Sequence, residues 1–300
     1  MNLGTFSPDQ TYALSVHSRL VLLSRFGDIM NYFENVKVVL QSFNNPLKKL
    51  KNLELKDELE QKFYDQEAEV HLDTFDPALY TFDENEAMPA THTYFYSLLK
   101  DVNNKKVLDI CCGYGFTSVL LAKRGAVVNS IDISPKMIEL TQKNAAFNAV
   151  NKNITAEKMS AQAMTFVDNM FDYVVGFGAI HHLNIDLAGR EISRVLKPGG
   201  RAIFIEPRIP FRLLILLRSA LPIKCLESPG GSQLTDKDIK KMSSYFHSQR
   251  IEYFIFLKKL ARLPFLGKNA ENLEKIDRRL VLKFPWLGKL FWAFVLEFKK

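Results

Sequence analysis

The sequence predicts an α/β fold with a mostly parallel sheet and helices on both faces. Over residues 105–206, short apolar runs of strand type alternate with segments whose apolar residues recur at helical spacing. The first run, 107–110, enters a turn that carries Gly113 and Gly115, and a helical segment begins at Phe116. Because a helix between two strands returns the chain to the same edge of the sheet, this alternation favours parallel pairing. With 300 residues, 47% of them apolar, the chain suits one large domain with additions.

Each element of this region has its own signal. Apolar or β-branched runs predict strands, and apolar residues three and four apart predict helices. The helix after the second strand has the clearest start, with Ser134 as the N-cap and Pro135 at the first helical position. The expected order is strand 106–110, helix 116–124, strand 126–131, helix 134–148, strands 154–159 and 171–177, helix 187–196 and strand 201–205.

The segments on either side differ from this core. Residues 1–100 show helical spacing and no strand pattern, so we expect an N-terminal helical extension that is a lid, a dimerisation arm or packing for the sheet. Residues 101–300 form the main domain, with aromatic, leucine-rich and basic insertions on the substrate side within 207–270. Thr235 is placed as a helix N-cap, and strands at 250–257 and 290–298 with a helix at 272–282 are expected to close the sheet.

The net charge of +7 is unevenly distributed. Residues 201–300 hold 20 Lys and Arg against 9 Asp and Glu, whereas the first 200 residues are slightly acidic. A basic C-terminal third can face an anionic substrate, a lipid headgroup surface or a nucleic acid, or it can be an ordinary solvated surface. These interpretations stay open, and peripheral membrane contact belongs to the second of them.

No part of the sequence indicates secretion or membrane insertion. The three cysteines include the adjacent pair Cys111 and Cys112, which cannot easily bridge, and the chain does not open with a basic start followed by an apolar block. The longest apolar run, near 209–217, is interrupted by Arg212 and is shorter than the roughly 20 residues of a spanning helix. We therefore expect a cytoplasmic protein.

Polar side chains fall where the predicted strands end. Asp109 lies in strand one, Asp132 ends strand two, Glu206 ends strand five, and His181 and His182 follow strand four. In an open parallel sheet, ligands bind outside the carboxyl ends of the strands. A carboxylate there can accept hydrogen bonds from both hydroxyls of a ribose. NAD sites and S-adenosylmethionine sites share that requirement.

The glycine turn separates these two kinds of site. A dinucleotide fingerprint needs a third glycine where Ser118 stands, and here the pattern is Asp-x-x-x-Gly-x-Gly from Asp109. Together with Asp132, the Phe-Asp pair at 171–172 and the Leu-Lys-Pro-Gly-Gly run at 196–200, it resembles the class I S-adenosylmethionine-dependent methyltransferases. Within them, it is similar to the small-molecule group that also holds the ubiquinone/menaquinone C-methyltransferases. The resemblance implies a Rossmann-like seven-stranded sheet and S-adenosylmethionine as the cofactor.

The resemblance also implies roles for individual residues. Gly113 and Gly115 would let the backbone pass the methionyl part of the donor, Asp109 would hold its amino group directly or through water, and Asp132 would bind the ribose hydroxyls. Ser160 stands where the family commonly has an acidic residue for the adenine amino group, which would shift adenine recognition to Gln162 or to backbone groups. The other expected donor contacts are Ile133, Met137, Ala161, Gly178 and Tyr64.

Several of these residues also have a structural explanation. A histidine near its normal pKa can remove a proton from a hydroxyl, so His181 and His182 are candidate bases, and Glu206 can orient an acceptor. In many family members, however, one histidine of this string only fixes the loop. The two aspartates can equally be strand-end caps, the Phe-Tyr-Asp-x-x-Ala string at 63–68 can be a helix over the cofactor or core packing, and both cysteines are expected to be packing residues.

The sequence as a whole favours an enzyme that methylates a small molecule. The sulfonium of the donor is already activated, so holding acceptor, methyl carbon and sulfur in line is the main requirement. We expect oxygen to accept the methyl group rather than nitrogen or carbon. The alternatives are a lipid or isoprenoid-quinone substrate at a membrane surface, and a non-catalytic partner subunit that binds the cofactor. We expect neither a metal nor a nucleic-acid substrate, since adjacent histidines diverge and no Asn-Pro-Pro-Tyr motif follows strand four. Neither the oligomeric state nor the acceptor's identity follows from the sequence.

Overall fold

The computed structural model describes residues 46–73, 90–207, 234–254 and 293–300, together with residues 276, 279, 280, 283 and 284. The chain divides into two compact units, Met1–Leu59 and Glu60–Lys300, and helix α2 (Pro46–Asp73) contributes to both. The sheet and the residues of the candidate site belong to the second unit. The helical spacing at 12–43 and the insertions at 211–231 and 258–267 lie outside the described residues.

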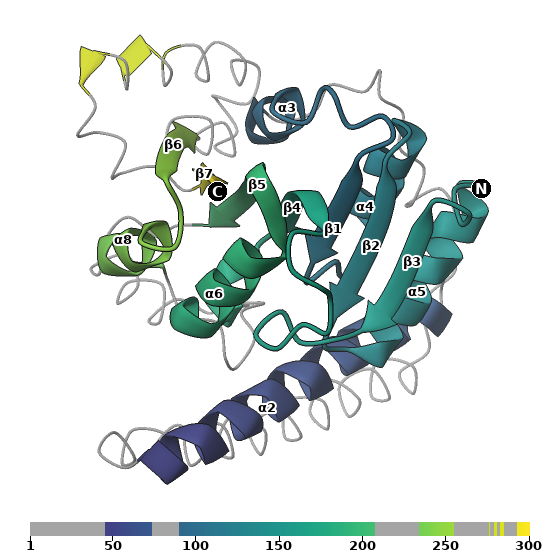
Figure 1. The fold of residues 1–300 in the computed structure, drawn as a ribbon. Coiled ribbons are helices and arrows are strands. Elements are labelled where there is room, and N and C mark those ends of the chain that lie inside the picture. The colour runs from purple at the N-terminus through teal and green to yellow at the C-terminus, as the bar shows by residue number, and fades with distance from the viewer. Residues whose placement is uncertain are drawn as a thin grey trace, which may run out of the picture. The chain divides into compact units, whose positions relative to one another are not determined.

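A seven-stranded sheet forms the centre of this unit (Figure 1). Its order is β3-β2-β1-β4-β5-β7-β6. The first five strands pair in parallel, and β7 is antiparallel to both β5 and β6. The sheet confirms the expected fold class. Its strands are β1 (Lys106–Ile110), β2 (Val127–Asp132), β3 (Ile154–Lys158), β4 (Phe171–Phe177), β5 (Leu196–Pro207), β6 (Ser248–Phe254) and β7 (Ala293–Lys299).

Helices cover both faces of the sheet. On one face, Phe95 and Leu120 pack with the sheet residue Val175, and on the other, Ile192 and Met242 pack in the cluster that holds Leu108 and Val174. The helices are α3 (Ala90–Ser97) and α4 (Phe116–Lys123) on the first face, α5 (Pro135–Phe147) beside β2 and β3, the 3-10 turn η2 (Ile180–His182), and α6 (Ile185–Val195) and α8 (Asp236–Ser243) on the second face.

Two predicted helix starts are confirmed by side-chain caps. Ser134 Oγ accepts a hydrogen bond from the backbone N–H of Met137 at 3.0 Å, and Pro135 follows as expected. Thr235 and Asp238 form a reciprocal capping box at the start of α8. Such caps satisfy backbone donors that have no partner within the helix, so they can be read from local sequence.

The boundaries around α6 differ from the prediction. The helix begins at Ile185 because the side chain of Asn184 accepts hydrogen bonds from the N–H groups of Asp186 and Leu187. Apolar spacing alone had placed the start at 187. The strand that follows begins at Leu196 instead of 201, since Leu196 already pairs with Phe171 across an irregular register.

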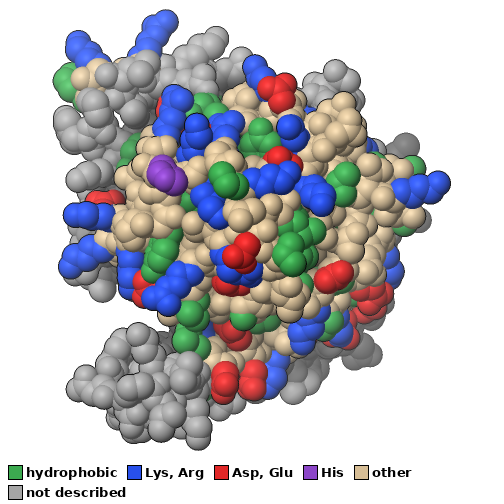
Figure 2. Space-filling view, viewed as in Figure 1, with side chains coloured by type: hydrophobic (Ala, Val, Ile, Leu, Met, Phe, Trp, Pro, Cys, Tyr) green, Lys and Arg blue, Asp and Glu red, His purple; other side chains and the backbone are tan. Residues whose placement is uncertain are grey.

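The strand order determines where a ligand can bind. From β1 the chain proceeds to β2 and β3 on one side and then crosses to β4 on the other, so the strand order reverses between β1 and β4, and a ligand is expected outside the carboxyl ends of these two strands. Among the described residues, no helix is both long and apolar enough to cross a membrane. Figure 2 shows many Lys and Arg side chains on the face that carries α6 and α8.

Candidate active site

The turn after β1 is held in a left-handed conformation. Cys111, Gly113 and Gly115 have φ angles of 50°, 51° and 75°. A Cβ at Gly113 would meet no atom within 4 Å, whereas one at Gly115 would lie 2.8 Å from Thr141 Cγ2. Gly115 is therefore required by packing against α5, and the open space above Gly113 leaves room for a ligand to approach the backbone.

Asp132 lies directly against this turn. Its Oδ2 accepts a hydrogen bond from the N–H of Gly113 at 3.0 Å, and its Oδ1 accepts one from the N–H of Ser134 at 2.9 Å. The side chain is buried, and burial raises its pKa to about 6 despite these hydrogen bonds. The carboxylate thus joins the ends of β1 and β2, the position expected for the ribose contact.

Asp109 faces the start of α4. Its Oδ2 accepts a hydrogen bond from Ser118 Oγ at 2.6 Å, and Ser118 Oγ lies 2.7 Å from Ser130 Oγ. The side chain is 1% exposed, and burial raises its pKa to about 7. Sequence reasoning had treated Ser118 only as a missing glycine. The Asp109 carboxylate already accepts a hydrogen bond from Ser118, and its contact with S-adenosylmethionine stays a prediction.

The raised pKa values of Asp109 and Asp132 predict a pH-dependent stability. Unfolding returns each carboxyl to its ordinary pKa near 3.8, so between about pH 4 and pH 7 the folded state holds protons that the unfolded state has released. As the pH rises, Asp109 should therefore lower the free energy of unfolding by about 1.4 kcal/mol per pH unit up to about pH 7, and Asp132 should do the same up to about pH 6. Urea unfolding at pH 4.5–8 measures the slope.

The isosteric variant Asp109→Asn provides the control for this slope. In this variant the slope of the free energy of unfolding against pH should lose the contribution of about one proton. The slope that remains below pH 6 belongs to Asp132. An unchanged slope in Asp109→Asn would show that the buried carboxyl titrates in its ordinary range.

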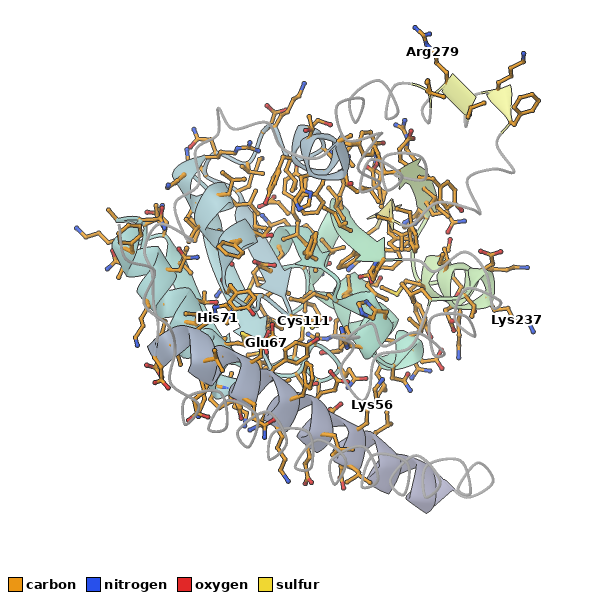
Figure 3. All side chains as sticks on the ribbon, turned by 180° about the vertical axis from the view of Figure 1, so that it is seen from behind. Lys56, Glu67, His71, Cys111, Lys237 and Arg279 are labelled. Carbon is orange, nitrogen blue, oxygen red and sulfur yellow. The ribbon has the colours of Figure 1, made fainter. Side chains whose placement is uncertain are left out.

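The second half of α2 covers the glycine turn and the start of α5. Asp65 Oδ1 accepts a hydrogen bond from Ser134 Oγ at 2.6 Å, and Ala68 packs against Met137 and Leu140. The hydroxyl of Tyr114, inside the turn, donates to Glu67. Figure 3 shows Glu67 and His71 on the part of α2 near Cys111. The predicted Phe-Tyr-Asp-x-x-Ala string thus packs on the cofactor side of the sheet, and its closing over a donor remains a prediction.

The two histidines follow β4 and form a partly buried pair. Their ring centroids lie 3.9 Å apart. His181 Nδ1 lies 2.8 Å from Glu206 Oε2, and His182 Nδ1 lies 3.2 Å from Glu60 Oε2. Tyr64 Oη lies 3.2 Å from His182 Nε2. The structure therefore brings together all three expected catalytic side chains, together with Glu60, which sequence reasoning missed. Its position four residues before Tyr64 on one helix is the signal that could have revealed it.

The residues expected around adenine have protein partners. Gln162 Oε1 accepts a hydrogen bond from the N–H of Asn184 at 2.6 Å, and the N–H of Gln162 donates to Ser160 Oγ at 3.3 Å. Ala161 is buried, and Ile133 is partly exposed beside Asp132. Gly178 has a φ of 60°, and its N–H donates to the carbonyl of Ile205. Their contacts with a donor stay predictions.

Both cysteines are packed beside the turn. Cys111 contacts the main core cluster, and Cys112 Sγ lies 3.5 Å from Thr141 Oγ1. Burial, followed by nearby carboxylates, raises the pKa of each thiol well above its ordinary value, which keeps the thiols protonated. This agrees with a packing role. The described residues contain no group of three or more His, Cys, Asp or Glu side chains that could hold a metal ion.

Comparison with known proteins finds a family that matches the central part of this chain. Residues 107–200 match a family described as a methyltransferase domain. This match to a methyltransferase domain agrees with the resemblance to the class I S-adenosylmethionine-dependent methyltransferases. The matched range runs from β1 through α6 to the start of β5, so it contains the glycine turn, Asp132 and the histidine pair.

Curated relatives of the methyltransferase domain include two quinone-pathway enzymes by name. The ubiquinone/menaquinone biosynthesis C-methyltransferase of Zymomonas mobilis is 36% identical over 113 residues, 37% of this chain and 46% of the relative. The demethylmenaquinone methyltransferase of Lactiplantibacillus plantarum is 36% identical over 118 residues, 38% and 49% of the two chains. The chain thus spans about half the length of the curated relatives that it matches.

A solved structure shows the same fold. Geranyl diphosphate C-methyltransferase from Streptomyces coelicolor A3(2) superposes with a TM-score of 0.50 at 13% sequence identity, over 70% of this chain and 78% of that one. At this identity the likeness concerns the fold of the methyltransferase domain, and it agrees with the expected seven-stranded sheet.

Proposed function

We propose that the chain transfers a methyl group from S-adenosylmethionine to a small-molecule acceptor. One observation carries the proposal beyond the family match. Four carboxyl side chains are buried on α2 and toward the carboxyl ends of β1, β2 and β5, namely those of Glu60, Asp109, Asp132 and Glu206. A buried acidic surrounding favours a cationic ligand, and the donor carries a sulfonium and an ammonium group. Methyl transfer removes the positive charge of the sulfonium group. The same acidic side chains therefore favour binding of S-adenosylmethionine over binding of its demethylated product.

The acceptor that we propose is a quinol-type aromatic ring, the isoprenoid-quinone alternative of the sequence interpretation. Two of the matched relatives are named for quinone substrates. Phe177, at the carboxyl end of β4, is 53% exposed, and its ring lies 5.2 Å from that of His92 on α3. An exposed aromatic ring at the end of a central strand suits stacking with a flat acceptor. The relatives' names favour carbon as the methylated atom, and nothing supports the earlier preference for oxygen.

Donor binding and acceptor screening test the proposal in that order. Calorimetry should show S-adenosylmethionine binding to the purified chain, and absence of binding would overturn the proposal. Labelled donor is then offered with reduced demethylmenaquinone, a short-tail naphthoquinol and simple phenols, and mass spectrometry locates the methyl group. Methylation of the quinol supports the acceptor proposed here. Methylation of the phenols alone overturns the acceptor class and leaves the transferase, and donor binding without any transfer supports the non-catalytic alternative.

Replacing Phe177 with alanine should raise the KM for the accepted quinol about tenfold, because an aromatic stacking contact contributes about 0.5–1.5 kcal/mol beyond the area it buries. The Kd for S-adenosylmethionine should stay unchanged. The matched control is Phe147→Ala at the far end of α5, where the ring is 46% exposed. Steady-state kinetics measure both variants, and an equal effect of the two substitutions would remove Phe177 from the acceptor site.

A further inference from the structure

Asp109 belongs to a buried polar cluster on the face of the sheet that α3 and α4 cover. It pairs in register with Ser130 on β2, and Asp132 follows Ser130 by two positions, so the three side chains point to the same face. Ser118 reaches the cluster from α4 and donates from Oγ to Asp109 Oδ2 at 2.6 Å. Asp132 is 7% exposed, and the other three side chains are exposed by 1% or less.

Within the part of the chain that the structure describes, no cation pairs with this cluster. Neither Asp109 nor Asp132 forms an ion pair with a lysine, arginine or histidine there. The titratable groups around the two carboxyls come from α3, the glycine turn and η2, and they are Tyr96, Cys111, Cys112 and His182, the last of which lies toward Asp132. The guanidinium of Arg124 lies over the Tyr96 ring at 5.0 Å. The Asp109 anion is therefore stabilised by hydrogen bonds from Ser118 and not by an ion pair.

Burial without a paired cation favours the neutral form of a carboxyl group. Removal from water destabilises a carboxylate far more than a carboxylic acid, and a second carboxylate nearby adds repulsion. Burial accordingly raises the pKa of Asp109 to about 7, against the hydrogen bonds from Ser118 and with a smaller contribution from Asp132. A cation that binds beside the cluster reverses this preference, because it stabilises the carboxylate and leaves the acid unaffected. S-adenosylmethionine carries such a charge on its sulfonium group, and its demethylated product does not.

We propose, on the basis of the function proposed above, that Asp109 distinguishes the methyl donor from its demethylated product through a change of ionisation. In the donor-free chain its carboxyl group holds a proton, and binding of the sulfonium expels that proton. Ser118 and Ser130 support the anion as a chain of hydroxyls. Ser118 donates to Asp109, so at a separation of 2.7 Å the hydroxyl of Ser130 donates to Ser118 Oγ. Asp109 is thus a specificity-determining residue that acts through its charge.

Charges and protons balance over one turnover. When the donor binds, the O–H bond of Asp109 breaks, its electron pair stays on the carboxylate and the proton passes to solvent. During methyl transfer the C–S bond breaks, its electron pair stays on sulfur as a neutral thioether, and the methyl carbon bonds to the acceptor, which releases one proton. The Asp109 carboxylate then takes a proton back from solvent. Because this reprotonation removes the charge that favoured the donor, the product is held less tightly.

Calorimetric titration of the full chain in two buffers of different ionisation enthalpy counts the protons released on binding. At pH 6.5 the amino group of either ligand is already protonated, so a released proton comes from the protein. We expect about one proton released per S-adenosylmethionine, most of it from Asp109, and less than half of that for S-adenosylhomocysteine. The Kd for S-adenosylmethionine should fall about tenfold between pH 6.0 and pH 7.5. Binding without proton release, or equal release for the two ligands, would overturn the proposal.

Three variants assign the proton to its residue. In Asp109→Asn the release at pH 6.5 should fall to about 0.2 proton, the share of Asp132, and an unchanged release would overturn the assignment. Ser118→Ala removes a hydrogen bond to the anion, so release should persist at pH 7.5, where the wild-type chain releases little; a purely structural loss would not move this profile. The matched control Asp172→Asn, near the amino end of β4, should release protons like the wild-type chain. Failure of the wild-type chain to bind S-adenosylmethionine at any pH would instead count against the proposed function.

Discussion

Replacing Asp132 with alanine should weaken the binding of S-adenosylmethionine at least 100-fold, which corresponds to about 2.7 kcal/mol. The carboxylate carries two N–H contacts, from Gly113 and Ser134, and the proposed ribose contact would add two more hydrogen bonds. Hydrogen bonds to a charged group contribute about 1.5–3 kcal/mol each, and the loss also releases the turn that the donor would pass. Isothermal titration calorimetry measures the Kd, and circular dichroism verifies the fold.

Two further variants make this expectation specific. Asp132→Asn keeps the shape and one carbonyl acceptor, so its loss of affinity should be smaller than that of Asp132→Ala. Asp172 lies near the amino end of β4, away from the carboxyl ends of the strands. Its carboxylate pairs with Lys197 at 2.9 Å and accepts a hydrogen bond from the N–H of Lys106. Asp172→Ala should bind the donor with wild-type affinity. If Asp132→Ala did so too, the turn would not be a donor site.

Replacing Gly115 with alanine should lower the free energy of unfolding by about 3 kcal/mol. A left-handed residue with a Cβ costs roughly 1–2 kcal/mol, and the new methyl would lie within 3.0 Å of three Thr141 atoms, including the backbone Cα. Overpacking of this kind adds about 1–3 kcal/mol. Because one of the three atoms belongs to the backbone of α5, rotation of the threonine side chain cannot relieve the contact. Chemical denaturation with urea measures the difference.

Gly113→Ala is the matched control for this effect. Its φ of 51° imposes the same left-handed strain, but a Cβ there would meet no atom within 4 Å. The loss should therefore be about 1–2 kcal/mol, that of strain alone. Equal losses in the two variants would show that α5 does not pack on Gly115 as described. The added methyl group would enter the space above Gly113 that S-adenosylmethionine would pass. We therefore expect Gly113→Ala to weaken the binding of S-adenosylmethionine although its loss of stability is small.

Much of the fold could be predicted because its signals are local. The alternation of apolar runs and helical spacing predicted β1 to β5, and the caps at Ser134 and Thr235 fixed two helix starts. The prediction placed α6 two residues late because the Asn184 cap was overlooked, although it also is a local signal. The irregular register between β4 and β5 was not predictable, since it depends on the fit of two strands.

The candidate site was predictable in part for the same reason. Parallel strands bring their carboxyl ends to one edge, so Asp132, His181 and Glu206 were expected near one another from strand ends alone. The order of the strands predicts which side chains lie near one another, but it does not predict which of them form hydrogen bonds. The contact of Asp109 with S-adenosylmethionine stays a prediction, and strand order did not reveal that Ser118 Oγ donates a hydrogen bond to this carboxylate.

The sequence alone determined the sheet, its glycine turn, the family resemblance and the strand ends at which the polar residues lie. Only the tertiary structure decided which groups hold the histidines. Tyr64 and His182 are 118 positions apart, and Glu206 reaches back 25 positions to His181. No periodicity or spacing records such a contact, because it depends on how α2 packs against the end of the sheet. The packing of separate elements thus gives each of the two adjacent histidine side chains its own hydrogen-bonding partners.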